Sequence, residues 1–212
     1  MPQRKIRIAF AGVGGMGQAA HLRNYATLHE DCEVVALAEL RPQLAQAVAR
    51  KYNVPRTYGT IAAMLAKEKV DAIVASQPFW RHGIIVPEVA QAGVPIFTEK
   101  PIAASVAVGE RIAAAVAAAK TWLMVGYHKR SDPATEYARK VIQELKQSGE
   151  LGKLNYVRIS MPPGDWVASG WTDNLQTDDI MPPLENDPKP HDMDEETTKL
   201  YEAFVNYYIH QV

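Results

Sequence analysis

Three glycines near the N-terminus have the spacing of a phosphate-binding loop. Gly12, Gly14 and Gly17 form G-x-G-x-x-G in the stretch IRIAFAGVGGMGQAAHL, directly after an apolar run and at the start of a helical pattern. The first glycine permits a tight turn, the second lets the backbone approach a pyrophosphate, and the third lets the helix pack on the strand. The helix N-terminus then offers free N–H groups to the phosphates. This loop, which includes Gly15 and Met16, is a candidate dinucleotide site.

An acidic residue follows the next apolar run at the distance that such a loop predicts. Glu39 ends the stretch VVALAE, roughly 20 residues beyond the glycines, where a carboxylate accepts hydrogen bonds from the adenosine ribose. Because a carboxylate there repels a 2′-phosphate, the sequence favours NAD over NADP. Arg41 lies close enough to weaken that preference, so NADP stays open. The alternative interpretation is a glycine turn in an α/β protein that binds no dinucleotide.

β-rich and helical patterns alternate over residues 1–126. The predicted strands are Ile6–Ala11, Val34–Ala38, Ala72–Ala75, Pro95–Thr98 and Leu123–Val125, and the predicted helices are Met16–Thr27, Pro42–Tyr52, Ile61–Lys67, His82–Ala92 and Val106–Ala119. Thr60 and Ser105 stand where N-caps belong, and Gly93 stands where a helix stops. This alternation predicts a doubly wound parallel sheet with helices on both faces, an α/β Rossmann domain. Its ligands bind at the carboxyl ends of the strands.

A second motif follows the fifth predicted strand. In PIFTEKPIA, the residues Glu99, Lys100 and Pro101 stand at the expected ligand-binding edge. With the glycine loop and Glu39, this triplet resembles the order and spacing of the Gfo/Idh/MocA oxidoreductases. The stretch SQPFWRH resembles the family's T-P-x-x-x-H, with Pro78 and His82 matching and Gln77 in place of the threonine. Similarly, VGYHKRSDPA resembles the family's G-F-x-R-R-F-D-P-A. The resemblance extends from Lys5 to about Val157.

The resemblance implies an NAD(P)-dependent enzyme that transfers a hydride between the nicotinamide and a secondary alcohol of a sugar or polyol. It places Lys100 between the nicotinamide and the substrate hydroxyl, where a cation stabilises a forming alkoxide. Without the resemblance, Lys100 would be interpreted as a solvated surface lysine. The implied cofactor-binding residues are those of the glycine loop with Glu39, Arg41, Gln77, Pro78, His82, Glu99 and Lys100. His128 is a candidate substrate contact, whereas His21 and His29 are expected on a helix surface.

The sequence changes character after Gly126. Asp132 and Pro133 predict the start of a helix that ends near Ser148, and LNYVRISM predicts a strand. The proline-rich acidic segment 162–195 is either an ordered functional loop or a segment that packs on something else, with Trp166, Trp171 and Leu175 as anchors. The acidic run KPHDMDEE matches no metal loop. It predicts a solvated helix N-terminus, so no metal is expected.

The last helical pattern carries Asn206 and His210, which are four residues apart and therefore share a face. In the family that the chain resembles, an aspartate and a histidine hold these positions and face the substrate. The resemblance implies that His210 is the general base and that Asn206 holds a substrate hydroxyl. Asn206 departs from the family's aspartate, because an amide cannot share charge or protons. The alternative for His210 is a core histidine without a catalytic part.

Composition and chain length complete the expectations. The chain has 212 residues, is 47% hydrophobic and carries a net charge of -1, which is typical of a soluble globular protein. Its single cysteine fits a reducing compartment such as the cytoplasm. No apolar run is long enough for a membrane span, and no basic run with aromatics indicates a nucleic-acid partner.

The apolar pattern that continues to Val212 without a stop signal suggests a fragment or a truncated reading frame. Residues 127–212 are therefore expected to form an incomplete α+β domain for substrate and oligomerisation, and the parent protein is expected to be a homo-oligomer. A nucleotide-binding module without turnover is the alternative function.

Overall fold

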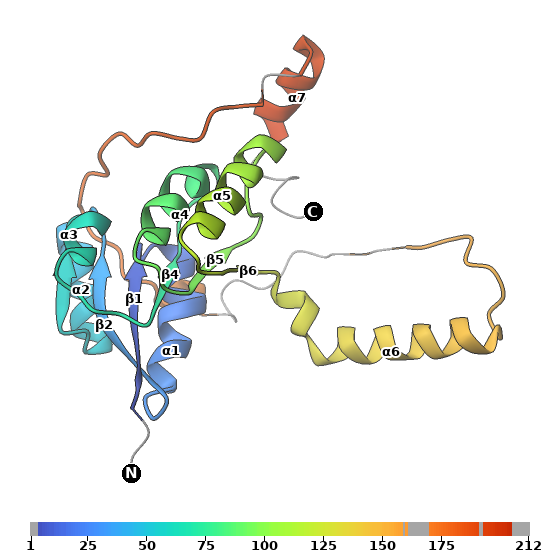
Figure 1. Cartoon of the computed structure of the whole chain (residues 1–212), viewed down its shortest axis with the longest axis horizontal. Helices are drawn as coiled ribbons and strands as arrows, with labels where there is room; N and C mark the ends of the chain where they lie inside the picture. The colour runs from blue at the N-terminus through green and yellow to red at the C-terminus, as the bar shows by residue number, and fades with distance from the viewer. Residues whose placement is uncertain (1–3, 159, 161–169, 191–192, 205–212) are drawn as a thin grey trace. The chain divides into compact units, whose positions relative to one another are not determined.

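A computed structural model describes residues 4–158, 160, 170–190 and 193–204. Its centre is a six-stranded, all-parallel sheet with the order β3-β2-β1-β4-β5-β6 (Figure 1). This is the strand order of a Rossmann fold. The strands are β1 (Ile6–Ala11), β2 (Cys32–Ala38), β3 (Arg56–Tyr58), β4 (Ala72–Ala75), β5 (Ile96–Glu99) and β6 (Leu123–Gly126).

Helices connect these strands. They are η1 (Gly17–Leu22), α1 (Arg23–Thr27), α2 (Pro42–Tyr52), α3 (Ile61–Leu65), η2 (Phe79–Arg81), α4 (His82–Ala90) and α5 (Val106–Ala118). The predicted caps are confirmed for α3 and α5, because the hydroxyls of Thr60 and Ser105 accept from Ala63 N at 3.1 Å and Val108 N at 3.3 Å. Gly93 has the expected positive φ, 66°. The predicted helix Met16–Thr27 divides into a π-helical first part, η1, and the short α1.

The core forms on both faces of the sheet because the central strands alternate between them. In β1, Ala9 and Ala11 pack with α3, α4 and α5, whereas Ile8 and Phe10 pack with Leu22 of η1 and with α2. All four side chains are buried. The predicted doubly wound α/β fold is therefore confirmed.

The chain comprises two compact units. The first is formed by Met1–Gly126 and Gly170–Val212, and the second by Tyr127–Ser169. This differs from the division at residue 126 expected from the sequence, since the segment after 169 returns to the first unit. That segment, residues 170–190, is called the strap here. It contains one 3-10 turn, η4 (Trp171–Asp173), and is followed by α7 (Glu195–Phe204).

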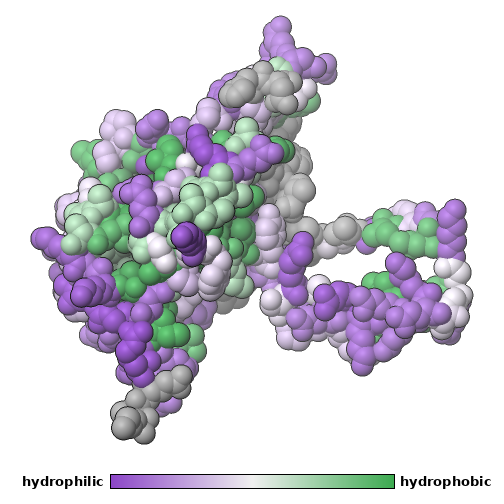
Figure 2. Space-filling view, in the orientation of Figure 1, coloured by the Kyte–Doolittle hydropathy of each residue, from purple (hydrophilic) through white to green (hydrophobic). Residues whose placement is uncertain are grey.

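The second unit contains η3 (His128–Ser131) and α6 (Pro133–Ser148). Asp132 caps α6 as predicted, accepting from Ala134 N at 2.8 Å, and Gly149 ends it with φ 72°. The predicted strand LNYVRISM is wrong for its described residues 154–158, which form no strand. The described part of this unit has no other strand with which that backbone could pair. Figure 2 shows apolar surface on this unit. The side chains of Leu154 and Val157 are exposed.

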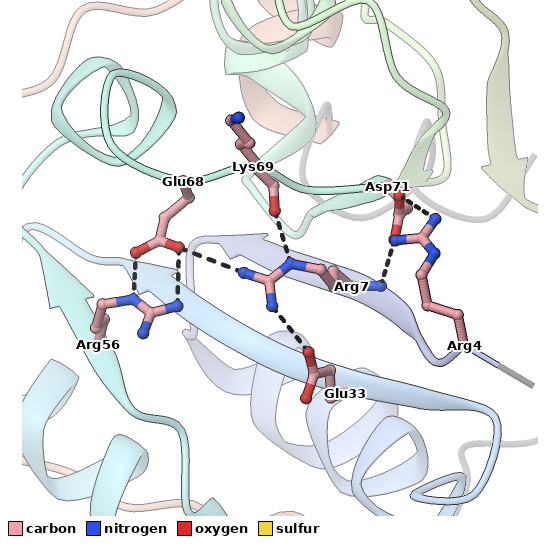
Figure 3. Close-up of polar contacts among 7 residues, drawn as sticks. All are labelled: Arg4, Arg7, Glu33, Arg56, Glu68, Lys69 and Asp71. Carbon is pink, nitrogen blue, oxygen red and sulfur yellow. Dashed lines mark hydrogen bonds and ion pairs between the residues drawn. The ribbon is translucent and has the colours of Figure 1, made fainter. Parts of the chain in front are cut away.

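An ion-pair network links the amino ends of the strands, at the edge opposite the glycine loop (Figure 3). Arg7 at the start of β1 donates to Glu33 of β2 at 2.9 Å and, through its backbone N–H, to Asp71 before β4 at 2.8 Å. Glu68 pairs with Arg56 at the start of β3. Since ligands of this fold bind at the other edge, the network has a structural role. Within the described residues, no helix is long and apolar enough to cross a membrane.

Candidate nucleotide-binding site

The glycine loop follows β1 at the carboxyl edge of the sheet. β1 and β4 are paired there, and the chain that leaves β1 leads to β2 on one side whereas the chain that leaves β4 leads to β5 on the other. Gly12 has φ 96°, a left-handed conformation that favours glycine, and its N–H donates to Ala38 O at 2.8 Å. A Cβ on Gly12 would strike the Ser76 carbonyl and the Gln77 side chain, and a Cβ on Gly17 would lie 3.0 Å from Gly12 O. Gly14 differs, because its nearest neighbour would be Arg41 Nη2 at 3.7 Å. The loop is thus closely packed against the protein at Gly12 and Gly17, whereas space is open beside Gly14.

Glu39 stands at the end of β2 with its carboxylate buried against this loop. Its Oε2 accepts from Val13 N at 3.1 Å, and its Oε1 accepts from Arg41 Nε at 2.8 Å and from Arg41 N at 3.2 Å. Arg41 Nη2 also donates to Oε2 at 3.2 Å. Both charges are therefore held in one fork-shaped pair beside the glycine loop.

A cavity of about 470 Å³ opens between the glycine loop and Glu39. This size lies within the range of small-molecule sites, roughly 300–1,000 Å³. Loops from four strand ends line it, and the strap adds Met181 and Leu184 on one side. The arrangement fits the adenosine half of a dinucleotide, with an open glycine backbone for phosphate, a carboxylate for ribose hydroxyls and apolar side chains for a base. The other lining residues include Gly12, Gly14, Arg41, Gln77, Pro78 and Ile85.

Four groups of contacts hold the strap against the rest of the first unit, together with a hydrogen bond from Lys51 Nζ of α2 to Asp173 O at 2.8 Å. The first group lies beside the glycine loop. Gln18 is buried, and its side-chain amide exchanges two hydrogen bonds with the Leu175 backbone, at 2.8 Å and 3.1 Å. Leu175 packs on the core cluster that contains Phe10. The Trp171 indole covers Gly15 so closely that a Cβ there would lie 2.7 Å from it.

The other three groups lie farther along the strap. Asp179 accepts from the backbone N–H groups of Gln43 and Leu44 in α2, at 3.3 Å and 2.9 Å. Arg81 Nε donates to Glu185 O at 2.9 Å. Asp187 accepts from Gly83 N at 2.8 Å and from Arg111 at 2.7 Å. The strap thus crosses from α2 to α4 and forms one wall of the cavity on the way.

The end of β5 carries a second polar group of side chains. Glu99 Oε1 lies 2.9 Å from His21 Nε2, and Glu99 Oε2 accepts from Lys100 N at 3.2 Å. Burial raises the pKa of the Glu99 carboxyl, but the hydrogen bond and charge of His21, with the nearby Lys100, bring the pKa below its usual range. The Lys100–Pro101 bond is cis. This arrangement holds a carboxylate, an imidazole and the start of the Lys100 loop together at the site edge.

Residues 6–127 match the model of the Gfo/Idh/MocA family, described as an oxidoreductase family with an NAD-binding Rossmann fold. The chain belongs to this family. It is 32% identical over 170 residues to an inositol 2-dehydrogenase of Rhizobium meliloti (strain 1021), covering 76% of this chain and 48% of that protein. It is 26% identical over 170 residues to a scyllo-inositol 2-dehydrogenase (NAD(+)) of Bacillus subtilis (strain 168), covering 78% of this chain and 48% of the relative.

A solved family structure has the same fold. The WlbA dehydrogenase from Bordetella pertussis, in complex with NADH and UDP-GlcNAcA, superposes with a TM-score of 0.62 and 27% identity. The match covers 71% of this chain and 44% of that one. The chain thus spans about half the length of the family members that it matches.

The structure brings only part of the predicted cofactor-binding set to the cavity. Residues that line it are Gly12, Gly14, Glu39, Arg41, Gln77 and Pro78. Gly17 packs behind the loop, and Gly15 lies under Trp171. Met16, Glu99 and Lys100 do not line the cavity, so their part in cofactor binding stays a prediction.

His82, which is predicted to contact the cofactor, does not line the cavity. It is fully buried, with Nδ1 3.1 Å from Ile102 O and Nε2 3.1 Å from Gln77 O. Burial lowers its pKa. In this structure His82 ties the Gln77 loop to the loop after Lys100, and its part in cofactor binding stays a prediction.

The remaining sequence predictions divide between the two units. His29 is exposed, as expected, whereas His21 was wrongly expected on the surface and instead pairs with Glu99. His128 begins η3 of the second unit, and its substrate contact stays a prediction. Asn206 and His210 lie outside the described residues. Within the described ranges, no group of three His, Cys, Asp or Glu side chains is placed to hold a metal ion.

Sequence reasoning missed the strap residues that complete the site. Trp171 and Leu175 were recognised as anchors without a partner, whereas Asp179, Met181 and Leu184 carried no motif. The one sequence feature that could have indicated them is the presence of apolar residues among the prolines of IMPPLE. Gln18 was also missed, because a glutamine in a helical pattern is ordinarily solvent-exposed.

Proposed function

We propose that this chain forms the cofactor-binding part of an NAD-dependent oxidoreductase acting on a secondary alcohol of a polyol or sugar. The observation that carries the proposal is the cavity at which the open Gly14 backbone and the Glu39 carboxylate meet. We assign the glycine loop to the pyrophosphate and Glu39 to the adenosine ribose. The names of the inositol dehydrogenase relatives support a cyclic polyol as the substrate.

The chain's own residues supply the proton chemistry in this proposal. NAD, held by the glycine loop and Glu39, would supply the hydride acceptor for the alcohol carbon. We assign Lys100 to the substrate hydroxyl, where its cation stabilises the negative charge that forms on oxygen. His210 is the proposed general base, because a neutral imidazole takes a proton near pH 7. Asn206 and His128 are proposed to hold substrate hydroxyl groups.

Binding and turnover are tested separately. Isothermal titration calorimetry with NAD measures binding. The absorbance of reduced nicotinamide, followed with myo-inositol, scyllo-inositol and a panel of sugars, measures turnover. We expect NAD to bind and a polyol to be oxidised. NAD binding without turnover on any alcohol would support the alternative, a nucleotide-binding module. Failure to bind NAD contradicts both functions.

Three further expectations about the whole protein are part of this proposal. Its single cysteine supports a cytoplasmic location. Family resemblance supports assembly into a homo-oligomer, which light scattering on the purified protein tests. We expect a small-molecule substrate and no nucleic-acid partner, so a gel-shift experiment with DNA or RNA should show no shift.

A further inference from the structure

NAD and NADP differ only in a phosphate on the 2′-oxygen of the adenosine ribose. In a Rossmann fold this oxygen lies near the end of β2, so a 2′-phosphate needs positive groups there. Two such groups are available in principle, the Arg41 guanidinium and the N-terminus of α2, whose free N–H groups attract anions. The question is whether either group is accessible to a phosphate.

Both groups are already engaged by carboxylates of this chain. Arg41 donates two side-chain hydrogen bonds to Glu39, at 2.8 Å and 3.2 Å. At the start of α2, Pro42 has no N–H, and the next two N–H groups, of Gln43 and Leu44, both donate to Asp179. The following N–H, of Ala45, donates to Arg41 O within the helix. The first turn of α2 therefore keeps no backbone donor for a ligand.

Asp179 is held in this place by the strap. Thr177 Oγ1 donates to Asp179 Oδ2 at 2.7 Å, and Met181, two residues later, lines the cavity. Burial raises the pKa of Asp179, but the hydrogen bonds from Thr177 and α2 and the charge of Arg41 bring it below its usual value. The carboxylate is thus ionised at neutral pH. Two negative side chains, from distant parts of the sequence, flank one arginine.

We propose that Asp179 is a second determinant of cofactor choice, which excludes NADP by occupying the N-terminus of α2 with a negative charge. This inference rests on the proposed NAD binding of the chain. Glu39 repels the 2′-phosphate and holds Arg41, and Asp179 takes the backbone donors that an NADP-binding protein would offer. Selectivity against NADP therefore depends on the strap as well as on β2.

The test compares the dissociation constants of NAD and NADP, measured by isothermal titration calorimetry, in the wild type and in Asp179→Asn. The amide keeps the shape of the side chain and removes its charge. We expect NADP to bind about tenfold more tightly, the effect of removing one unit charge beside a phosphate, and NAD to change less than about twofold. Asp178→Asn is the matched control, because Asp178 is exposed and makes the same charge change one residue earlier.

A second variant, Asp179→Ser, removes the same charge without introducing an amide. Serine also caps helices, so the N-terminus of α2 keeps a capping side chain. The same gain in NADP binding is expected. If NAD binds the wild type but both variants keep the wild-type ratio of the two constants, or weaken both cofactors equally, Asp179 only caps α2 and the inference is wrong. If the wild type does not bind NAD, the proposed function itself fails.

Discussion

Gly14 differs from the other loop glycines because the folded protein has room for a side chain there. Replacing Gly14 with alanine places a methyl group where its nearest neighbour is 3.7 Å away, so the fold should tolerate it. The same methyl occupies the space through which a pyrophosphate approaches the backbone. We expect the melting temperature of Gly14→Ala to stay close to the wild type, while NAD affinity falls by about tenfold or more.

Thermal melting and calorimetric titration on the same samples measure this separation. Gly109→Ala is the control, since Gly109 in α5 also has open space around it and lies outside the cavity. It should keep NAD affinity. Unchanged NAD binding in Gly14→Ala would remove the glycine loop from the proposed site.

His82 makes stability depend on pH, because burial lowers its pKa in the folded state. Between the lowered pKa and the unfolded value, about 6.5, the unfolded chain binds more protons. Stability from this residue is therefore complete above about pH 6.5 and is lost as the pH falls below it, by at most about 1.4 kcal/mol per pH unit. Urea denaturation at a series of pH values from 7.5 to 5.5 measures how the unfolding free energy changes with pH.

His82→Gln should unfold more easily at pH 7.5 but show a shallower loss on acidification. His29→Gln, which changes an exposed histidine, should follow the wild type. An identical slope in His82→Gln and the wild type would show that another group controls the acid response.

At the scale of elements, the strap depends on Gln18. Replacing Gln18 with alanine removes both hydrogen bonds to the Leu175 backbone, and we expect a loss of about 1–2 kcal/mol in unfolding free energy. Because the contact is local, amide exchange should rise chiefly in residues 173–187 rather than in the sheet. Hydrogen exchange read by mass spectrometry measures this pattern.

Gln46→Ala is the matched control, since Gln46 lies exposed on α2. It should leave exchange in the strap unchanged. Equal exchange in the Gln18→Ala and wild-type straps would mean that the remaining contacts of the strap suffice to hold it.

The regular elements were predictable from the sequence, and the strap was not. Ile6–Ala11 and Pro42–Tyr52 were predicted to the residue, because apolar periodicity and a proline at the first helical turn mark them. The edge strand β3 was missed, since Arg56–Tyr58 is short and has no apolar run. An irregular segment has no period at all, and its position depends on single side chains such as Asp179 and Asp187.

The same contrast applies to the site. The glycine loop and Glu39 were predictable because local geometry dictates their spacing. By contrast, the pairing of His21 with Glu99 joins residues from η1 and β5, and no local pattern reports such a contact. The burial of His82 was missed for the same reason.

At the scale of the whole first unit, stability and binding lie at opposite edges of the sheet. Glu68 accepts hydrogen bonds from Arg56 and Tyr58 and lies 3.9 Å from Arg7 Nη2. Figure 3 shows Glu68 between Arg56 and Arg7, and Glu68→Gln removes the negative charge that both arginines face. We expect unfolding free energy to fall by about 1–2 kcal/mol, with NAD affinity unchanged because Glu68 itself does not line the cavity.

Urea denaturation and calorimetric titration provide the two measurements. Glu30→Gln is the control, because Glu30 is an exposed acid near the same edge. A change of NAD affinity in Glu68→Gln that exceeds that of the control would contradict the separation of the two edges.

The return of the strap to the first unit has a consequence for family chimaeras. Joining residues 1–126 of this chain to the C-terminal portion of another family member keeps the glycine loop and Glu39. It also discards Asp179, Met181 and Leu184, and with them one wall of the cavity. A breakpoint at the end of β6 therefore does not transplant an intact cofactor site. Chimaeras that transfer the cofactor site should therefore contain residues 170–190 of this chain together with residues 1–126.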